Sequence, residues 1–122
     1  MLHDPRAYLW DVQQAAEAID KFTAGHDARS YAEDALVQAA VERKFGIIGE
    51  ALNRLSKVDP ALAERVPHLR TIVGFRNVLI HGYALVDHAR VWHIRETLLP
   101  SLHATVSALL ADLGPPDEPA WP

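Results

Sequence analysis

The chain has 122 residues, 49% of them apolar, which is enough for one compact domain with an ordinary hydrophobic core. It contains no cysteine, which excludes a disulfide framework and a thiolate metal site. Its formal net charge of -4 argues against a broad, non-specific surface for nucleic acid, because such a surface depends on many Lys and Arg side chains.

The first half of the chain predicts two helices. Asp4 and the proline after it are typical of a helix start, and the apolar residues that follow recur at helical spacing, so we expect a first helix that ends near Gly25. Ser30 and Glu33 match a capping box, in which the serine side chain bonds a free backbone amide and the glutamate reaches back. The apolar stripe that follows predicts one long helix from Ser30 to about Lys57.

The second half predicts two more helices and a tail. A third helix over 69–80 is apolar almost all round, and such a helix is expected to be buried on more than one side. Gly82 can end it in the left-handed conformation. Asp87 can cap a fourth helix, which Pro100 is expected to kink or split in two. Residues 114–122 are too rich in proline to pack as a helix and predict a flexible tail.

These elements define a fold class. No segment of useful length alternates polar and apolar residues as a strand would, so the chain is predicted to be all-α. Four helices joined by short loops predict an antiparallel up-and-down four-helix bundle over residues 1–113. The segment 1–10 lacks the features of a signal peptide, and no apolar run approaches the roughly 20 residues of a membrane span. We therefore expect a soluble, cytoplasmic protein.

Side chains that can carry chemistry gather in RNVLIHGY, residues 76–83. The segment 65–81 holds three arginines and two histidines and no Asp or Glu. Arg76 and His81 are five residues apart, about 140° around an ideal helix, so they share no face of one straight helix. Joint action would need the helix end or a partner subunit. The structural alternative is that Arg76 extends out of the core, His81 is favoured at a helix C-terminus, and Tyr83 packs after the turn.

Arg76, His81 and Tyr83 form an R-x4-H-x-Y pattern that is similar to the signature of the HepT-like toxins, a branch of the HEPN ribonuclease superfamily. Three further segments resemble that family in the same order: YLWDVQQAAEAI (8–19), KFGIIGEALNRLS (44–56) and VDHARVWHIRETLLPSL (86–102). The resemblance extends over about residues 5–113, so residues 1–113 are identified as a HepT-like HEPN helical domain. Gly82 departs from the family, many of whose members carry an aspartate there, and this puts in doubt any role for a carboxylate at that position.

The resemblance implies the toxin of a type II or type VII toxin-antitoxin pair: an endoribonuclease that works without a metal or cofactor, in a groove between the two subunits of a homodimer. Arg76 would clamp phosphate oxygens. His81, with an ordinary pKa near 6.5, would serve as acid or base, and the second subunit's copy would share the proton transfers. The implied antitoxin is a minimal nucleotidyltransferase, and Tyr83 resembles the residue that receives AMP from it, which would block RNA entry.

Two residues are candidate supports for this site. Asn77 follows Arg76 directly in the sequence. Glu50 lies in the predicted long helix, where it could face Arg76 as a buried acid or pair with Arg54 at the i,i+4 spacing on the surface. The sequence leaves both possibilities for Glu50 open.

Two other patterns have better structural explanations than functional ones. Gly46 and Gly49 spell G-x-x-G, which in a loop could clamp a nucleic-acid backbone, but here they lie in a long helical pattern, where close helix packing is the preferred explanation. The remaining histidines include no His-Glu-x-x-His motif, so no metal site is predicted.

A second class of function stays open. The chain could be a non-catalytic HEPN module that binds a nucleotidyltransferase partner and assists the binding of nucleotide or substrate. The intact motif favours the ribonuclease, because a scaffold has no physical need for His81 at that position. The net charge of -4 favours the module.

Overall fold

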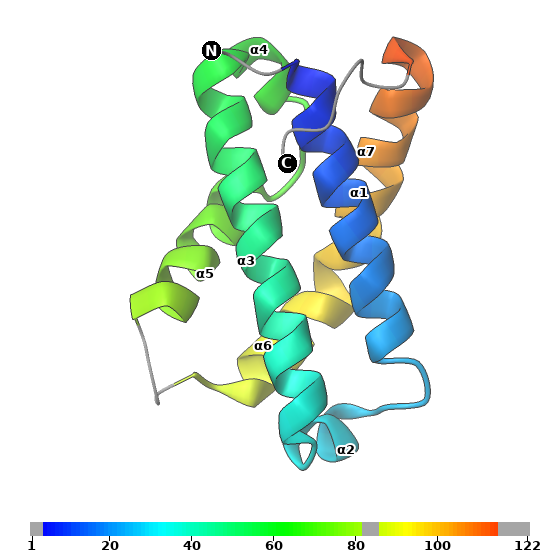
Figure 1. The fold of residues 1–122 in the computed structure, drawn as a ribbon, viewed down its shortest axis with the longest axis vertical. Coiled ribbons are helices and arrows are strands. Elements are labelled where there is room, and N and C mark those ends of the chain that lie inside the picture. The colour runs from blue at the N-terminus through cyan, green and yellow to red at the C-terminus, as the bar shows by residue number, and fades with distance from the viewer. Residues whose placement is uncertain (1–3, 82–85, 115–122) are drawn as a thin grey trace.

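The computed structural model describes residues 4–81 and 86–114, and this part of the chain consists of helices without a strand (Figure 1). The helices are α1 (Pro5–Phe22), α2 (Ala28–Ala32), α3 (Ala35–Val58), α4 (Pro60–Ala63), α5 (Leu69–His81), α6 (His88–Thr97) and α7 (Leu99–Leu113). The predicted all-α bundle is confirmed. None of the helices within the described ranges is long and apolar enough to cross a membrane.

Helix α3 is the central element of the bundle. It packs against α1 on one side and α5 on the other, while α7 packs against α1 (Figure 1). Successive long helices run up and down, as predicted, and α2 and α4 are short turns at opposite ends of α3. Helix α5, which carries Arg76 and His81, therefore lies at the side of the bundle and packs mainly against one neighbour.

The first helix begins and ends close to the predicted residues. Asp4 caps α1 by accepting a hydrogen bond from the backbone N–H of Arg6 at 2.9 Å, and Pro5 is the first helical residue. The helix ends at Phe22, and Gly25 follows with φ 81°, a conformation that glycine adopts without a side-chain penalty.

The predicted long second helix is wrong at its start. Asp27, not Ser30, caps the first turn, since its side chain accepts from the Ser30 N–H at 2.8 Å while the Ser30 hydroxyl accepts from the Asp27 N–H at 3.0 Å. This capping box begins the short α2. A second cap, Asp34, accepts from the Val37 N–H at 3.1 Å and begins α3. The chain therefore breaks between two capped helices, and Glu33 takes no part in a capping box.

The third predicted helix has the expected span but not the expected burial. Only Ile72 and Phe75 of α5 are fully buried, whereas Val78 is 39% and Ile80 is 45% exposed. The expectation of burial on more than one side is therefore wrong for the single chain. The reason is the position of α5 at the side of the bundle, where α3 covers only one of its faces.

The split in the last helix is confirmed. Asp87 caps α6 by accepting from the Ala89 N–H at 3.0 Å. A new helix, α7, begins at Leu99 with Pro100 in its first turn, where the missing N–H of proline costs no hydrogen bond. The predicted roles of Gly82 as a helix end and of the segment 115–122 as a tail lie outside the described residues.

The two glycines of the G-x-x-G pattern have different surroundings. A Cβ added to Gly49 would lie 2.8 Å from Arg76 Cγ and closer still to Arg76 Cβ, so α3 and α5 make their close approach here. The packing role predicted for Gly49 is confirmed. For Gly46 it is wrong, because in the described part of the chain no atom beyond the adjoining stretch of α3 lies within 4 Å of the position that a Cβ would take. Phe45 and Phe75 complete the contact between the two helices, with their rings edge to face at 5.5 Å.

Candidate active site

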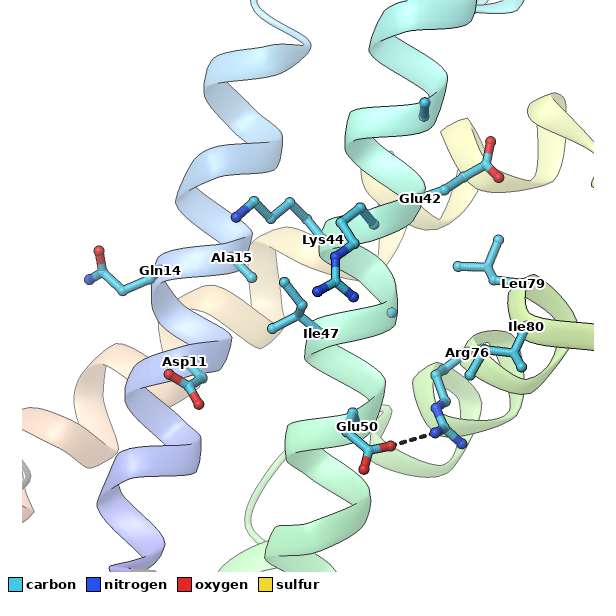
Figure 2. Close-up of a pocket in the computed structure, with 13 residues that line it drawn as sticks. Asp11, Gln14, Ala15, Glu42, Lys44, Ile47, Glu50, Arg76, Leu79 and Ile80 are labelled. Carbon is cyan, nitrogen blue, oxygen red and sulfur yellow. Dashed lines mark hydrogen bonds and ion pairs between the residues drawn. The ribbon is translucent and has the colours of Figure 1, made fainter. Parts of the chain in front are cut away.

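Arg76 is the best-anchored candidate residue. Its side chain is 24% exposed, and its Nη2 donates to Glu50 Oε2 at 2.5 Å (Figure 2). Its Nη1 donates to Asn77 Oδ1 at 3.0 Å. Glu50 also accepts from Arg54 Nε at 2.8 Å, so both arrangements left open for Glu50 occur together. The structure thus brings Arg76, Asn77 and Glu50 into one cluster that holds the guanidinium in a fixed orientation.

The guanidinium keeps hydrogen-bonding capacity beyond these two contacts. An arginine offers five N–H donors in a planar fork, which matches two phosphate oxygens. Nε of Arg76 is buried and donates to no acceptor in the described part of the chain. Because Nε is not accessible, a phosphate arriving at Arg76 would use the donors that remain on Nη1 and Nη2 and compete with Glu50 for the cation. The Glu50 carboxylate therefore positions Arg76 and also reduces the positive charge that the site presents.

His81 stands apart from this cluster. It is the last residue of α5 and is exposed to solvent. Within residues 4–81 and 86–114, it makes no hydrogen bond or ion pair with Arg76. Five helical residues rotate the two side chains about 140° apart and separate them by about 7.5 Å along the axis. Asn77 precedes His81 by one helical turn and so lies on the same face of α5. Tyr83 and Gly82 lie outside the described residues.

An open groove extends from Arg76 across the face of α3 toward α1. Its volume is about 970 Å³, and Figure 2 shows Arg76 and Ile80 at its α5 side and Gln14 at its α1 side. We call it the Arg76 groove. Arg43, Lys44 and Gly46 of α3 also line it. A second groove, of about 700 Å³, lies along the other side of α5 and is lined by Asn77, Arg70 and His68, and we call it the Asn77 groove. His81 lines neither.

A partly buried polar cluster of Tyr31, Glu42 and His88 joins α2, α3 and α6 beside the Arg76 groove. Tyr31 is fully buried, and its hydroxyl has no hydrogen-bond partner among the described residues. The His88 ring lies edge-on to the Tyr31 ring at 6.3 Å, and its Nδ1 is 3.9 Å from Glu42 Oε2. Burial raises the pKa of the Glu42 carboxyl, and the nearby His88 opposes part of that rise. Burial, and then the charge of Glu42, raise the pKa of Tyr31 well above its ordinary value.

Sequence reasoning missed this cluster. Its members are far apart along the chain, and none belongs to a motif of recognisable spacing. The one available signal was a tyrosine in a predicted helix, which is too common to indicate such a cluster. The described residues contain no group of three or more His, Asp or Glu side chains that could hold a metal ion. Cleavage without a metal stays a prediction.

The raised pKa of Glu42 predicts a pH-dependent effect of Glu42→Gln on stability. A raised folded-state pKa means that the protonated carboxyl is favoured, so this contribution is fully present below the ordinary value of 4.5 and is lost as the pH rises through the folded pKa. Glutamine mimics the protonated form at every pH. The variant should therefore unfold at a higher temperature than wild type at pH 8 and at nearly the same temperature at pH 4.

Thermal unfolding followed by circular dichroism at the two pH values measures this difference. Glu33→Gln is the control, since Glu33 is exposed and pairs only loosely with Arg29 at 3.8 Å. A gain for Glu42→Gln that is larger at pH 4 than at pH 8 would contradict the proposed sign.

The chain is a helical bundle that carries an anchored arginine within α5 and an exposed histidine at the end of the same helix, as the resemblance to the HEPN proteins predicts. The family described as Ribonuclease HepT-like matches residues 12–109, and the chain belongs to this family, within the HEPN superfamily. It is 32% identical over 102 residues to a "Probable ribonuclease HepT" of Thermococcus cleftensis. The aligned residues make up 84% of this chain and 92% of that protein. It is 27% identical over 117 residues, 94% of each chain, to a Methanocaldococcus jannaschii protein named "Putative RNase MJ1216". No solved structure matches the chain significantly.

Proposed function

We propose that this protein is a metal-independent endoribonuclease that cleaves RNA in a groove between two subunits, with Arg76 and His81 as its catalytic residues. The observation that carries this proposal is the anchored Arg76 of a chain from a ribonuclease family: its guanidinium is oriented by Glu50 and Asn77 and lines an open groove.

The reaction requires three things of the protein. A base removes the proton from the 2′-hydroxyl, whose oxygen then attacks the neighbouring phosphorus. A cation stabilises the negative charge on the phosphoryl oxygens as phosphorus becomes five-coordinate, and Arg76 is suited to this because its fork binds two oxygens at once. An acid gives a proton to the 5′-oxygen as its bond to phosphorus breaks. The products are a 2′,3′-cyclic phosphate and a 5′-hydroxyl.

A homodimer would supply both the base and the acid that this reaction needs. His81 can act as base or acid near neutral pH, but one histidine cannot take a proton and give one in the same step. Two subunits with their α5 ends side by side would supply two copies of His81. The exposed Val78 supports this arrangement, because an apolar side chain left open near the end of α5 in one chain is suited to pack against another.

The same proposal includes a partner and a cellular role. We infer that the protein is the toxin of a type II or type VII toxin-antitoxin pair in the cytoplasm, where its RNA substrate is found. The antitoxin would be a nucleotidyltransferase that transfers AMP to Tyr83. The negative charge that AMP adds would repel the RNA backbone.

Replacing Tyr83 by phenylalanine tests the modification. Incubated with the cognate nucleotidyltransferase and ATP, the wild-type chain should gain the mass of AMP and stop cleaving RNA. Tyr83→Phe should keep its activity and do neither, because it has no hydroxyl to accept the group and its ring does not supply the base. Intact-mass measurement and an RNA cleavage gel record both results. Equal adenylylation of both chains would exclude Tyr83 as the acceptor.

The second candidate function is a non-catalytic module that binds a nucleotidyltransferase and assists nucleotide or substrate binding. The Glu50 carboxylate favours it, since it already partners the Arg76 cation, and so does the net charge of -4. Incubation of the purified chain with labelled RNA in EDTA separates the two functions. The ribonuclease should cut the RNA by itself, whereas the module should leave it intact.

A further inference from the structure

The two grooves that flank α5 offer two courses for an RNA strand through the proposed active site. The Arg76 groove crosses α3 toward α1, and the Asn77 groove follows the opposite side of α5 toward α4. Only the first is lined by the Arg76 side chain itself. A strand whose cleaved phosphate is held by Arg76 would therefore continue along the Arg76 groove.

Acidic and basic side chains both line the Arg76 groove, but the acids there are paired or buried, so the groove is suited to bind a polyanion. Arg43 and Lys44 line it from α3, and neither forms a hydrogen bond or ion pair within the described ranges. The groove's acids are already occupied or shielded. Glu50 is paired with Arg76 and Arg54, Glu42 faces His88, and Asp11 is only 7% exposed. Two cations are thus left to attract phosphates.

Gly46 adds an independent observation about the floor of this groove. It lies in the middle of α3, where glycine is less favourable than alanine by about 1 kcal/mol, and nothing packs against it within the described chain. The fold itself has no need for a glycine there. Without a side chain at this point, the α3 backbone stays accessible between Arg43 and Glu50, which are about 10 Å apart along the helix.

We propose that the Arg76 groove binds the single-stranded RNA next to the cleaved phosphate. Arg43 and Lys44 bind backbone phosphates, and Gly46 lets the strand lie close to α3. Exposed Ile80 and half-buried Ile47 give the bases an apolar surface. This course rests on the proposed ribonuclease function, and it adds two phosphate-binding residues that lie outside the R-x4-H-x-Y motif.

Charge reversal in each groove tests this course. Binding of a fluorescein-labelled single-stranded RNA of about twenty nucleotides is measured by anisotropy in the full-length His81→Ala chain, so that the probe is not cut. Arg43→Glu and Lys44→Glu should each raise Kd on the order of tenfold, and each should lower the slope of log K against log salt by about 0.7. Arg70→Glu, in the Asn77 groove, and Arg29→Glu, outside both, make the same charge change and should leave Kd within about twofold.

Gly46→Leu is a charge-neutral test of the same groove. It should weaken RNA binding by filling the floor while leaving the salt slope unchanged and the fold intact. In chains that retain His81, Arg43→Glu and Lys44→Glu should raise KM for RNA and leave kcat near the wild-type value, because neither residue touches the reacting atoms.

The possible failures are distinguishable. A wild-type chain that neither binds nor cleaves RNA overturns the ribonuclease function and this course with it. RNA cleavage by wild type together with normal RNA binding by Arg43→Glu and Lys44→Glu overturns the course alone. Weaker binding only in Arg70→Glu assigns the RNA to the Asn77 groove instead. A loss of dimer mass in Arg43→Glu or Lys44→Glu, measured by light scattering, makes this groove a subunit interface and also overturns the proposal.

Discussion

His81→Ala is expected to abolish RNA cleavage in the presence of EDTA, with a loss on the order of a hundredfold to ten-thousandfold, the usual contribution of a positioned acid or base. In the proposed mechanism His81 is the only side chain of the 76–83 segment that exchanges a proton near neutral pH, since the ordinary pKa of a tyrosine is near 10. Alanine removes that function and leaves the rest of α5 in place.

His81→Ala should change catalysis without disturbing the fold. His81 is exposed at the last residue of α5 and contributes nothing to the buried core. Helix content, unfolding temperature and oligomer mass should therefore match those of wild type. His93→Ala removes another exposed histidine, on α6, and should leave cleavage unchanged. Wild-type rates in His81→Ala would show that this residue has no catalytic role.

The second large effect is expected on stability, when Gly46 and Gly49 are each replaced by alanine. Gly49→Ala should destabilise the protein by about 1–3 kcal/mol, because the new methyl would overlap Arg76 Cβ and force α3 and α5 apart. Gly46→Ala should instead stabilise it by up to about 1 kcal/mol, since alanine favours the helix and its methyl meets no described residue of another helix within 4 Å. The two substitutions share one chemistry, so their difference isolates the contact between the helices.

Gly49→Ala should also reduce activity through Arg76. A displacement of about 1 Å in a catalytic group can lower a rate on the order of a hundredfold, and the methyl would push directly on the Arg76 side chain. Urea unfolding gives the free energies, and RNA cleavage under folding conditions gives the rates. If Gly49→Ala were as stable and as active as Gly46→Ala, the close approach of α3 and α5 at this point would be disproved.

Local signals predicted most of the fold. Asp4, Asp87 and Pro100 act through neighbours within one helical turn, so the sequence alone contains the whole interaction. Ser30 shows the limit of such signals, because a serine followed by a glutamate fits the start of a long helix as well as the third position of a short one. Asp27 caps one helix and Asp34 caps the next, so the segment forms two helices instead of one long helix.

Burial and tertiary contacts were harder to predict. The apolar character of α5 indicates how much surface needs a partner, but not whether that partner lies in the same chain. Arg76 and Glu50 are 26 residues apart, and their pairing depends on the register of α5 against α3, which Gly49 helps to set. The Tyr31, Glu42 and His88 cluster depends on three helices meeting and had no counterpart in any sequence pattern.

The most direct test of the central claim is the chemistry of the RNA ends made by the purified wild-type chain in EDTA. A labelled single-stranded RNA is incubated with the protein, and the products are separated on a gel and identified by mass spectrometry. Cleavage by His81 and Arg76 through the 2′-oxygen predicts fragments with a 2′,3′-cyclic phosphate and a 5′-hydroxyl, formed at full rate without a metal and absent with His81→Ala. Intact RNA in EDTA, or fragments that appear only when a divalent metal is added, would contradict it.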